Sequence, residues 1–126
     1  MYWCIAFSDE TRNKIIKIAR HFSLLPIDWD IYIDHITLIH SSNPNFEAVS
    51  NILCNFEGHS IPFRLTGVGI SDRAVAFKVD TRTANAVSHI TLAVAPGAKP
   101  VESNDIEQWD KLYCNEEFYG TLIFKD

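Results

Sequence analysis

The chain has 126 residues, of which 47% are hydrophobic and 12% are aromatic. This size and composition suit one folded domain over residues 1–126 and argue against disorder. No apolar run approaches the roughly 20 residues that a membrane-spanning helix needs, so we expect no membrane association. The formal net charge is −5, and no run of Lys or Arg is present, which argues against binding of long duplex nucleic acid. A nucleotide ligand is therefore expected to be small, or to be a strand end held in a local pocket.

The three cysteines, Cys4, Cys54 and Cys114, leave one thiol unpaired in any disulfide scheme, and none forms a C-x-x-C motif. We interpret them as free thiols in a reducing compartment, which predicts a cytoplasmic protein. The first seven residues lack the basic segment and the small-residue cleavage site of a signal peptide. They are interpreted as the first strand.

In chain order, alternation predicts a strand over residues 2–8, and Ser8 or Asp9 is expected to cap a helix that runs to about Phe22. Its predicted buried stripe is Ile15, Ile18, Ala19 and Phe22. A connection over residues 24–30 precedes a predicted strand over residues 31–40. Asn43-Pro44 then predicts the start of a second amphipathic helix that ends at Gly58. The apolar residues at helical spacing in it are Phe46, Val49, Ile52, Leu53 and Phe56.

The second half of the chain is richer in strands. Residues 61–70 and 74–79 predict a hairpin, with Val75, Phe77 and Val79 on its buried face. A polar connection over residues 81–86 leads to a strand over residues 89–95 and then to a loop over residues 96–100. Asn104 and Glu107 resemble a capping box for a short helix, and residues 118–124 predict a closing strand. The predicted fold class is therefore α+β.

One four-residue motif occurs twice, as His35-Ile36-Thr37-Leu38 and as His89-Ile90-Thr91-Leu92. In a strand, alternate side chains share a face, so each copy directs one imidazole and one hydroxyl to the same side of a sheet. Two facing copies would supply one proton acceptor, one proton donor and two hydroxyl donors for a phosphate. This set is suited to hydrolysis of a phosphodiester.

The other histidines carry no such pattern. His40 has the opposite strand parity to His35 and is interpreted as a strand-end residue, while His21 ends a helix and His59 lies in a turn. No spacing matches a metal-ligand set, and no glycine-rich phosphate loop is present. We therefore expect neither a metal ion nor another cofactor.

The paired H-x-T motifs resemble those of the two-histidine (2H) phosphoesterase superfamily. The segment Lys99-Pro100-Val101-Glu102-Ser103-Asn104 after the second motif is similar to the cyclic phosphodiesterase domain of fungal and plant tRNA ligases. Asp34 before the first motif and the Asp72-Arg73-Ala74-Val75-Ala76 hairpin agree with it. The resemblance implies a bilobal fold, with two antiparallel sheets lining a groove and helices packed outside. It also implies metal-free hydrolysis of 2′,3′-cyclic phosphates, to a 2′-phosphate in the most similar members.

Carried over by position, this resemblance makes His35, Thr37, His89 and Thr91 the catalytic set. We expect His89 to activate water and His35 to protonate the leaving oxygen, although the symmetry of the motifs leaves these roles exchangeable. Candidates for substrate binding are Lys78 and Lys99 for positive potential, and Trp109 and Tyr32 for stacking on a base.

The ligase and kinase domains that accompany this domain in tRNA ligases are absent from the sequence, which leaves the biological substrate open. The expected partners are RNA 3′ ends or small nucleotides, and the expected oligomeric state is a monomer. Two alternatives remain. One is a phosphodiesterase that degrades 2′–5′-linked or cyclic oligonucleotide signals, as in immune evasion. The other is a nucleotide-binding module without catalysis.

Overall fold

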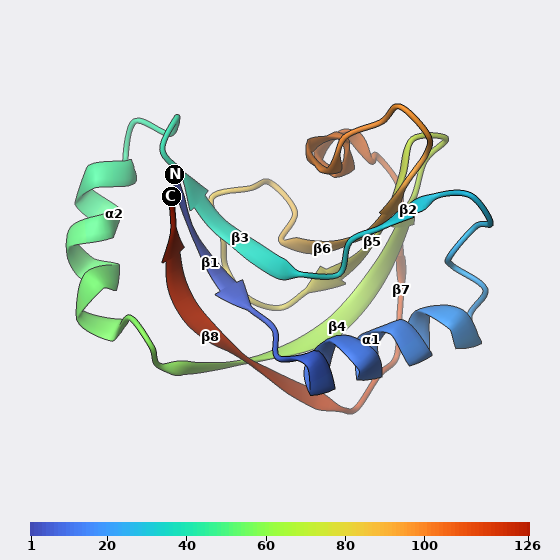
Figure 1. Ribbon diagram of the computed structural model, residues 1–126, viewed down its shortest axis with the longest axis horizontal. Coiled ribbons are helices and arrows are strands. Elements are labelled where there is room, and N and C mark those ends of the chain that lie inside the picture. Colours follow the sequence, from blue (N-terminus) through green and yellow to red (C-terminus); the bar gives the residue numbers. More distant parts are fainter.

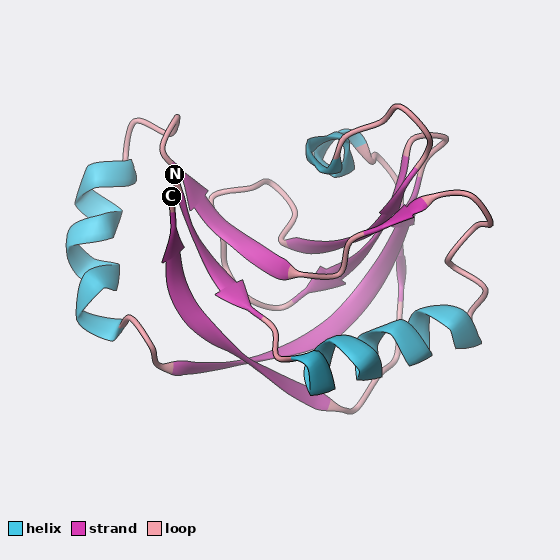
Figure 2. Ribbon diagram, viewed as in Figure 1, coloured by secondary structure: helices cyan, strands magenta, loops and turns pink.

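The computed structural model describes residues 1–126 and consists of a strongly curved antiparallel sheet with helices on its outside (Figures 1 and 2). In chain order the elements are β1 (Tyr2–Ala6), α1 (Asp9–His21), β2 (Asp30–Ile31), β3 (His35–His40), α2 (Phe46–Leu53), the 3₁₀ turn η1 (Cys54–Phe56), β4 (Ser60–Ile70), β5 (Ala74–Val79), β6 (His89–Val94), the 3₁₀ turn η2 (Pro100–Asp105), β7 (Trp109–Lys111) and β8 (Glu117–Lys125).

The sheet has eight strands in the order β2-β6-β5-β4-β8-β1-β3, and β7 pairs with β4 beside this path. The long strand β4 joins its two halves. Residues 60–64 of β4 pair with β8, whereas residues 65–70 pair with β5. The first motif lies on β3 in one half and the second motif lies on β6 in the other. The predicted α+β architecture with outer helices is confirmed, and the two predicted antiparallel sheets are the two halves of one continuous sheet.

The main core lies between α1 and the sheet and includes Ile15 and Ala19 of that helix. Ser8 caps α1 through its hydroxyl, which accepts the Thr11 backbone N–H at 3.2 Å. The predicted stripe was wrong at Phe22, which is the C-cap residue and is 49% exposed. The buried thiol of Cys4 has its pKa raised to about 11 by that burial, so it is a poor thiolate at neutral pH.

The second helix is confirmed as an element, but its predicted bounds were wrong, because α2 ends at Leu53 and is followed by the 3₁₀ turn η1. Asn45 is its N-cap residue, while the Asn43 side chain accepts the Asn45 backbone N–H at 2.9 Å before the helix begins. No residue of α2 is fully buried, and Ile52 is 61% exposed. The reason is that α2 packs against a small cluster around Trp3, Ile39 and Leu122, so part of its apolar face remains uncovered.

The predicted strand over residues 31–40 is two strands in different halves of the sheet. β2 pairs with β6, whereas β3 pairs with β1. Between them, Ile33 has a φ of 54°, and its backbone N–H donates to the Thr91 carbonyl at 3.0 Å. A positive φ at a β-branched residue is unusual and costly, so this buried link is held by its surroundings. This hydrogen bond joins the segment before the first motif to Thr91 of the second motif.

The short helix predicted from Asn104 and Glu107 was also wrong. A 3₁₀ turn starts earlier, at Pro100, because the Glu102 carboxylate accepts the Lys99 backbone N–H at 2.6 Å. Residues 109–111 instead form the edge strand β7 on β4. There the Trp109 indole packs closely on Gly69, where an added Cβ would stand 2.7 Å from the ring. The closing strand β8 is confirmed.

Candidate functional site

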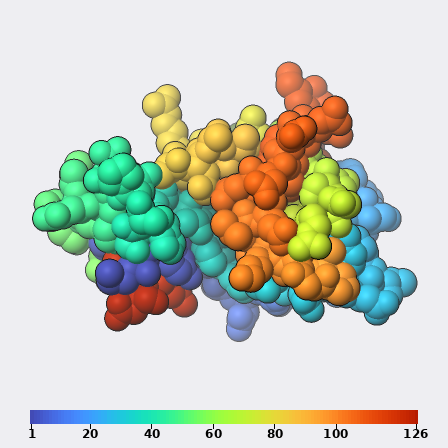
Figure 3. Space-filling model, turned by 90° about the horizontal axis from the view of Figure 1, so that it is seen from above, coloured from blue at the N-terminus to red at the C-terminus, as the bar shows by residue number.

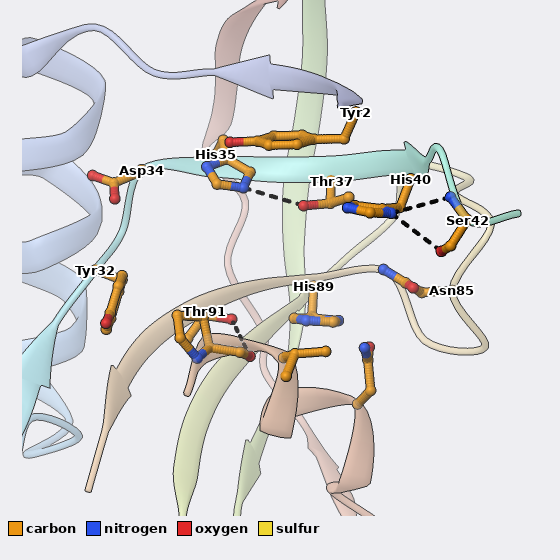
Figure 4. Close-up of a pocket in the computed structure, with 13 residues that line it drawn as sticks. Tyr2, Tyr32, Asp34, His35, Thr37, His40, Ser42, Asn85, His89 and Thr91 are labelled. Atoms are coloured by element: carbon orange, nitrogen blue, oxygen red, sulfur yellow. Dashed lines mark hydrogen bonds between the residues drawn. The ribbon is translucent and has the colours of Figure 1, made fainter. Parts of the chain in front are cut away.

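A cavity of about 640 Å³ lies between the two halves of the sheet, with both motifs in its wall (Figure 4). In the view from above, α2 (green) and η2 (orange) lie on opposite sides of the face (Figure 3). The lining residues are Tyr2, Tyr32, Asp34, His35, Thr37, His40, Ser42, Asn85, His89, Thr91, Pro100, Val101 and Asn104.

The two motifs share a distortion of the strand as well as a sequence. Trp3 pairs with Ile39 and Cys4 with Thr37, so Leu38 is an extra residue in β3. Likewise Val75 pairs with Ala93 and Ala76 with Thr91, so Leu92 is an extra residue in β6. A bulge of this kind bends the strand and reverses the alternation of faces beyond it. Each H-x-T pair therefore ends at a bulge at the equivalent leucine.

In the first motif the two polar side chains contact each other. His35 Nε2 lies 3.1 Å from Thr37 Oγ1, and the Tyr2 ring centroid lies 5.3 Å from that of His35. Burial lowers the pKa of His35, because it disfavours the charged imidazolium, and the nearby carboxylate of Asp34 offsets this only in part. His35 is therefore neutral at pH 7 in the free protein.

In the second motif the two side chains are held by separate partners. His89 Nδ1 lies 2.8 Å from the Val87 carbonyl oxygen, which can only accept, so Nδ1 carries a proton and Nε2 is the free nitrogen. Thr91 Oγ1 lies 2.9 Å from Ser103 Oγ and 3.4 Å from the Pro100 carbonyl oxygen. The turn η2 thus contacts the second motif and has no counterpart on the first.

The structure brings the four predicted catalytic side chains and Tyr32 to one cavity, whereas Lys78, Lys99 and Trp109 do not line it. Lys78 pairs with His89 in the sheet register but is exposed, and its side chain lies against Gly67. Lys99 is exposed at the start of η2. The Trp109 ring lies 6.3 Å from that of His89 and packs on Gly69 and Ile106, which is a supporting position.

Several lining residues have no signal in the sequence. The parity argument placed His40 on the face opposite to His35, but the bulge at Leu38 returns it to the cavity. A bulge of one residue cannot be recognised from alternation alone. Asn85 comes from a loop that the sequence describes only as a polar connection, and Asn104, which lies in η2, was predicted only as a helix cap.

No group of three or more His, Cys, Asp or Glu side chains is placed to hold a metal ion. No helix combines the length and the apolar character needed to cross a membrane.

Comparison with protein-family models matches residues 26–121 to the fungal tRNA ligase phosphodiesterase domain. Among solved structures, one described as "Crystal Structure of Fungal RNA Kinase" is similar, with a TM-score of 0.63 and 16% sequence identity. The alignment covers 96% of this chain and 44% of that one, so this chain spans less than half of its length. At this identity the likeness shows a shared fold. No curated protein matches.

Proposed function

The chain belongs to the family of fungal tRNA ligase phosphodiesterase domains, and from this we propose that it hydrolyses 2′,3′-cyclic phosphates at RNA 3′ ends or on nucleotides. Membership of this family supports a phosphodiesterase of the 2′,3′-cyclic type in general. The proposal adds that the product is a 2′-phosphate, that two histidines transfer the protons and that no metal ion takes part.

The observation that carries this proposal is the meeting of two H-x-T pairs across one cavity, each ending at an equivalent bulge. Hydrolysis of a cyclic phosphodiester needs one group to take a proton from water and another to give one to the leaving oxygen. It also needs donors for the charge that grows on the non-bridging oxygens. The hydroxyls of Thr37 and Thr91 are suited to this last task.

In the proposed reaction, water attacks phosphorus and loses a proton to one imidazole. The bond from phosphorus to the ribose O3′ breaks, and the other imidazolium protonates O3′, which leaves the phosphate on O2′. The lowered pKa of His35 favours its neutral form, which is the form that accepts a proton. The Nδ1–H of His89 donates to the Val87 carbonyl, which fixes the orientation of the ring and leaves Nε2 free to hand a proton to the leaving oxygen. These features favour His35 as base and His89 as acid, the reverse of the expectation from the sequence.

The primary test is turnover of a nucleoside 2′,3′-cyclic phosphate, with the product identified by ³¹P NMR as the 2′- or the 3′-phosphate. His35→Ala and His89→Ala should each lower the rate by about 10²-fold or more, because each removes a proton-transfer group. His59→Ala is the matched control, because that ring packs on Phe56 outside the cavity. Wild-type activity in both site variants would refute the acid–base assignment.

Two additions sharpen this test. Activity that EDTA abolishes would exclude the metal-free reaction. Turnover of 2′–5′-linked or cyclic oligonucleotides, with none of the cyclic mononucleotide, would replace the proposed substrate class with a signalling nucleotide.

The division of roles has its own test, which uses a p-nitrophenyl ester of a nucleoside phosphate. Its leaving group needs no proton, so removal of the general acid should cost much less on this ester than on the cyclic phosphate. We expect His89→Ala to show that smaller loss and His35→Ala to remain impaired on both substrates. The opposite pattern would restore His89 as the base.

A further inference from the structure

One end of the cavity carries a third histidine, His40, at a position where the internal repeat is broken. His40 follows the first motif as Val94 follows the second, and both lie beyond the bulge on the face of their H-x-T pair. Val94 is fully buried in a cluster with Ala74, Ala76 and Ile106 next to η2. His40 is exposed to the cavity. Val94 is therefore covered in the second half of the sheet, whereas the equivalent His40 is open to the cavity in the first half.

The His40 backbone and ring are held in place. The Ser41 N–H donates to the Met1 carbonyl at 2.9 Å, and the His40 carbonyl accepts the Asn43 N–H at 2.9 Å. The Tyr2 ring is nearly parallel to the imidazole, with an interplanar angle of 11° and centroids 6.3 Å apart. These contacts make His40 a fixed part of the wall.

The hydrogen bonds of His40 define which atom it offers to a ligand. Its Nδ1 accepts the Ser42 backbone N–H at 3.2 Å and lies 3.1 Å from Ser42 Oγ. A backbone N–H can only donate, so Nδ1 carries no proton and the neutral ring has its proton on Nε2. His40 therefore presents a donor and no acceptor. Asn85 lies near Ser42 at the same end of the cavity and adds an amide group (Figure 4).

We propose that the end of the cavity formed by His40, Ser42 and Asn85 is a subsite for a second phosphate, on the ribose 5′ oxygen of the nucleotide whose cyclic phosphate is cleaved. This inference rests on the proposed function. Phosphate oxygens are acceptors only, which matches a ring that offers a donor only. The one carboxylate in the lining, that of Asp34, lies at the opposite end (Figure 4).

Thr37 and His40 lie close enough along β3 to contact the two phosphates of one nucleotide. Thr37 and His40 are three strand residues apart, which is roughly 10 Å at the usual rise per residue, and less across a bulge. The second phosphate can belong to a mononucleotide, as a monoester, or to an RNA strand, as the next phosphodiester. Both present the same oxygens to His40.

The test compares three substrates with one base: uridine 2′,3′-cyclic phosphate, its 5′-phosphorylated form, and the dinucleotide UpU 2′,3′-cyclic phosphate. For the wild type we expect kcat/KM to be about tenfold or more higher with a 5′ phosphate, from one hydrogen bond to a charged group. His40→Ala should bring that ratio close to one. His40→Gln retains a neutral donor and should keep part of the preference, and His59→Ala should keep all of it.

The outcomes separate the two proposals. No turnover of any of the three substrates would overturn the proposed function itself. Turnover of all three with equal kcat/KM, or a preference that survives in His40→Ala, would overturn the phosphate subsite and leave the function intact. A gain with the dinucleotide but none with the 5′ monoester would point to contacts with the second nucleoside and would also overturn it. A gain with the monoester alone identifies a mononucleotide as the source, and a gain with both includes an RNA strand.

Discussion

Ser103 is the only polar residue in the buried set, at 1% exposure, and its hydroxyl lies 2.9 Å from that of Thr91. If Ser103 donates this bond, the Thr91 proton is free to point to a phosphate in the cavity. Thr37 has no such partner, because its hydroxyl contacts His35 of the same motif. The sequence predicted the same role for Thr37 and Thr91. It could not show that Ser103, twelve residues after Thr91, orients only that one of the two.

We predict that Ser103→Ala lowers kcat for the cyclic phosphate by about tenfold and lowers the free energy of unfolding by about 1 kcal/mol, the usual net value of one hydrogen bond. The rate should fall because the Thr91 hydroxyl then turns to its remaining partner, the Pro100 carbonyl. Steady-state kinetics and urea unfolding measure the two effects. Ser60→Ala, at the exposed start of β4, is the control. An unchanged kcat with the expected loss of stability would reduce Ser103 to a structural role.

The lowered pKa of His35 predicts a specific pH dependence. Between the folded pKa and the unfolded value of about 6.5, the unfolded chain binds more protons at this site than the folded chain does. The contribution of His35 to the free energy of unfolding is therefore fully present above pH 6.5. It is lost as the pH is lowered through the folded pKa of His35. An NMR titration of the five imidazoles should give His35 a midpoint below 6.5. His35→Gln should flatten the unfolding free energy in that window, and a midpoint above 6.5 would contradict the role of burial.

Among the elements, the predictable ones were those with a long pattern of their own. The Ser8 cap and the helix after it, the hairpin of β4 and β5, and the closing strand follow from local residues. The two motifs were placed on strands for the same reason. The bulges, the break around Ile33 and the edge strand β7 depend on pairing with distant segments, so local alternation could not locate them.

The turn η2 is held over the second motif by one carboxylate. The two oxygens of Glu102 accept bonds from Arg73 at 3.0 and 3.3 Å, and one of them also accepts the Lys99 backbone N–H. The hydrogen bond from Arg73, followed by that from Lys99, lowers the pKa of Glu102, so the carboxylate stays charged in mildly acidic solution. We call these bonds of Glu102 with Arg73 and Lys99 the clamp. It joins the turn between β4 and β5 to η2, the segment that carries Ser103.

We predict that Glu102→Gln loosens this turn, because an amide weakens both the charged pair and the acceptor for Lys99. Amide hydrogen exchange over residues 99–105 should become faster at pH 7, and KM for the cyclic phosphate should rise about threefold to tenfold, the loss of roughly one hydrogen bond. Glu107→Gln is the matched control, because that carboxylate is exposed and makes no hydrogen bond or ion pair in the fold. Equal exchange in the two variants would show that η2 is held without the clamp.

At the scale of the whole molecule, the fold creates one site from two separate halves. Two backbone hydrogen bonds join the halves. Ile33, just before the first motif, donates its N–H to the Thr91 carbonyl, and Ala84, in the loop before β6, donates to the Leu38 carbonyl at 2.8 Å. These backbone bonds between the two halves of the sheet help to fix the distance between the motifs. The repeat in the sequence indicated that two halves should meet. It did not indicate the crossing bonds, because they involve backbone groups that carry no pattern.

The net charge of the chain limits the number of RNA phosphates that it can contact. With a net charge of −5, the chain can contact few phosphates, and the two subsites proposed above account for two. Each neutralised phosphate of a single strand contributes about −0.7 to the slope of log affinity against log salt concentration. Because the cavity is lined by no Lys or Arg and offers neutral donors to the phosphates, we predict a slope shallower than about −0.7 for the apparent affinity of a short 5′-phosphorylated cyclic-phosphate RNA, measured as 1/KM between 50 and 200 mM salt.

In His40→Ala the apparent affinity should fall while the slope stays the same, because the lost group is a neutral donor, and His59→Ala should change neither. Extending the strand beyond two nucleotides should not steepen the slope, since no Lys or Arg lines the cavity and the sequence has no run of basic residues. A slope near −3, or one that grows with strand length, would reveal an extended RNA-binding surface and contradict the idea that this chain recognises only the end of a strand.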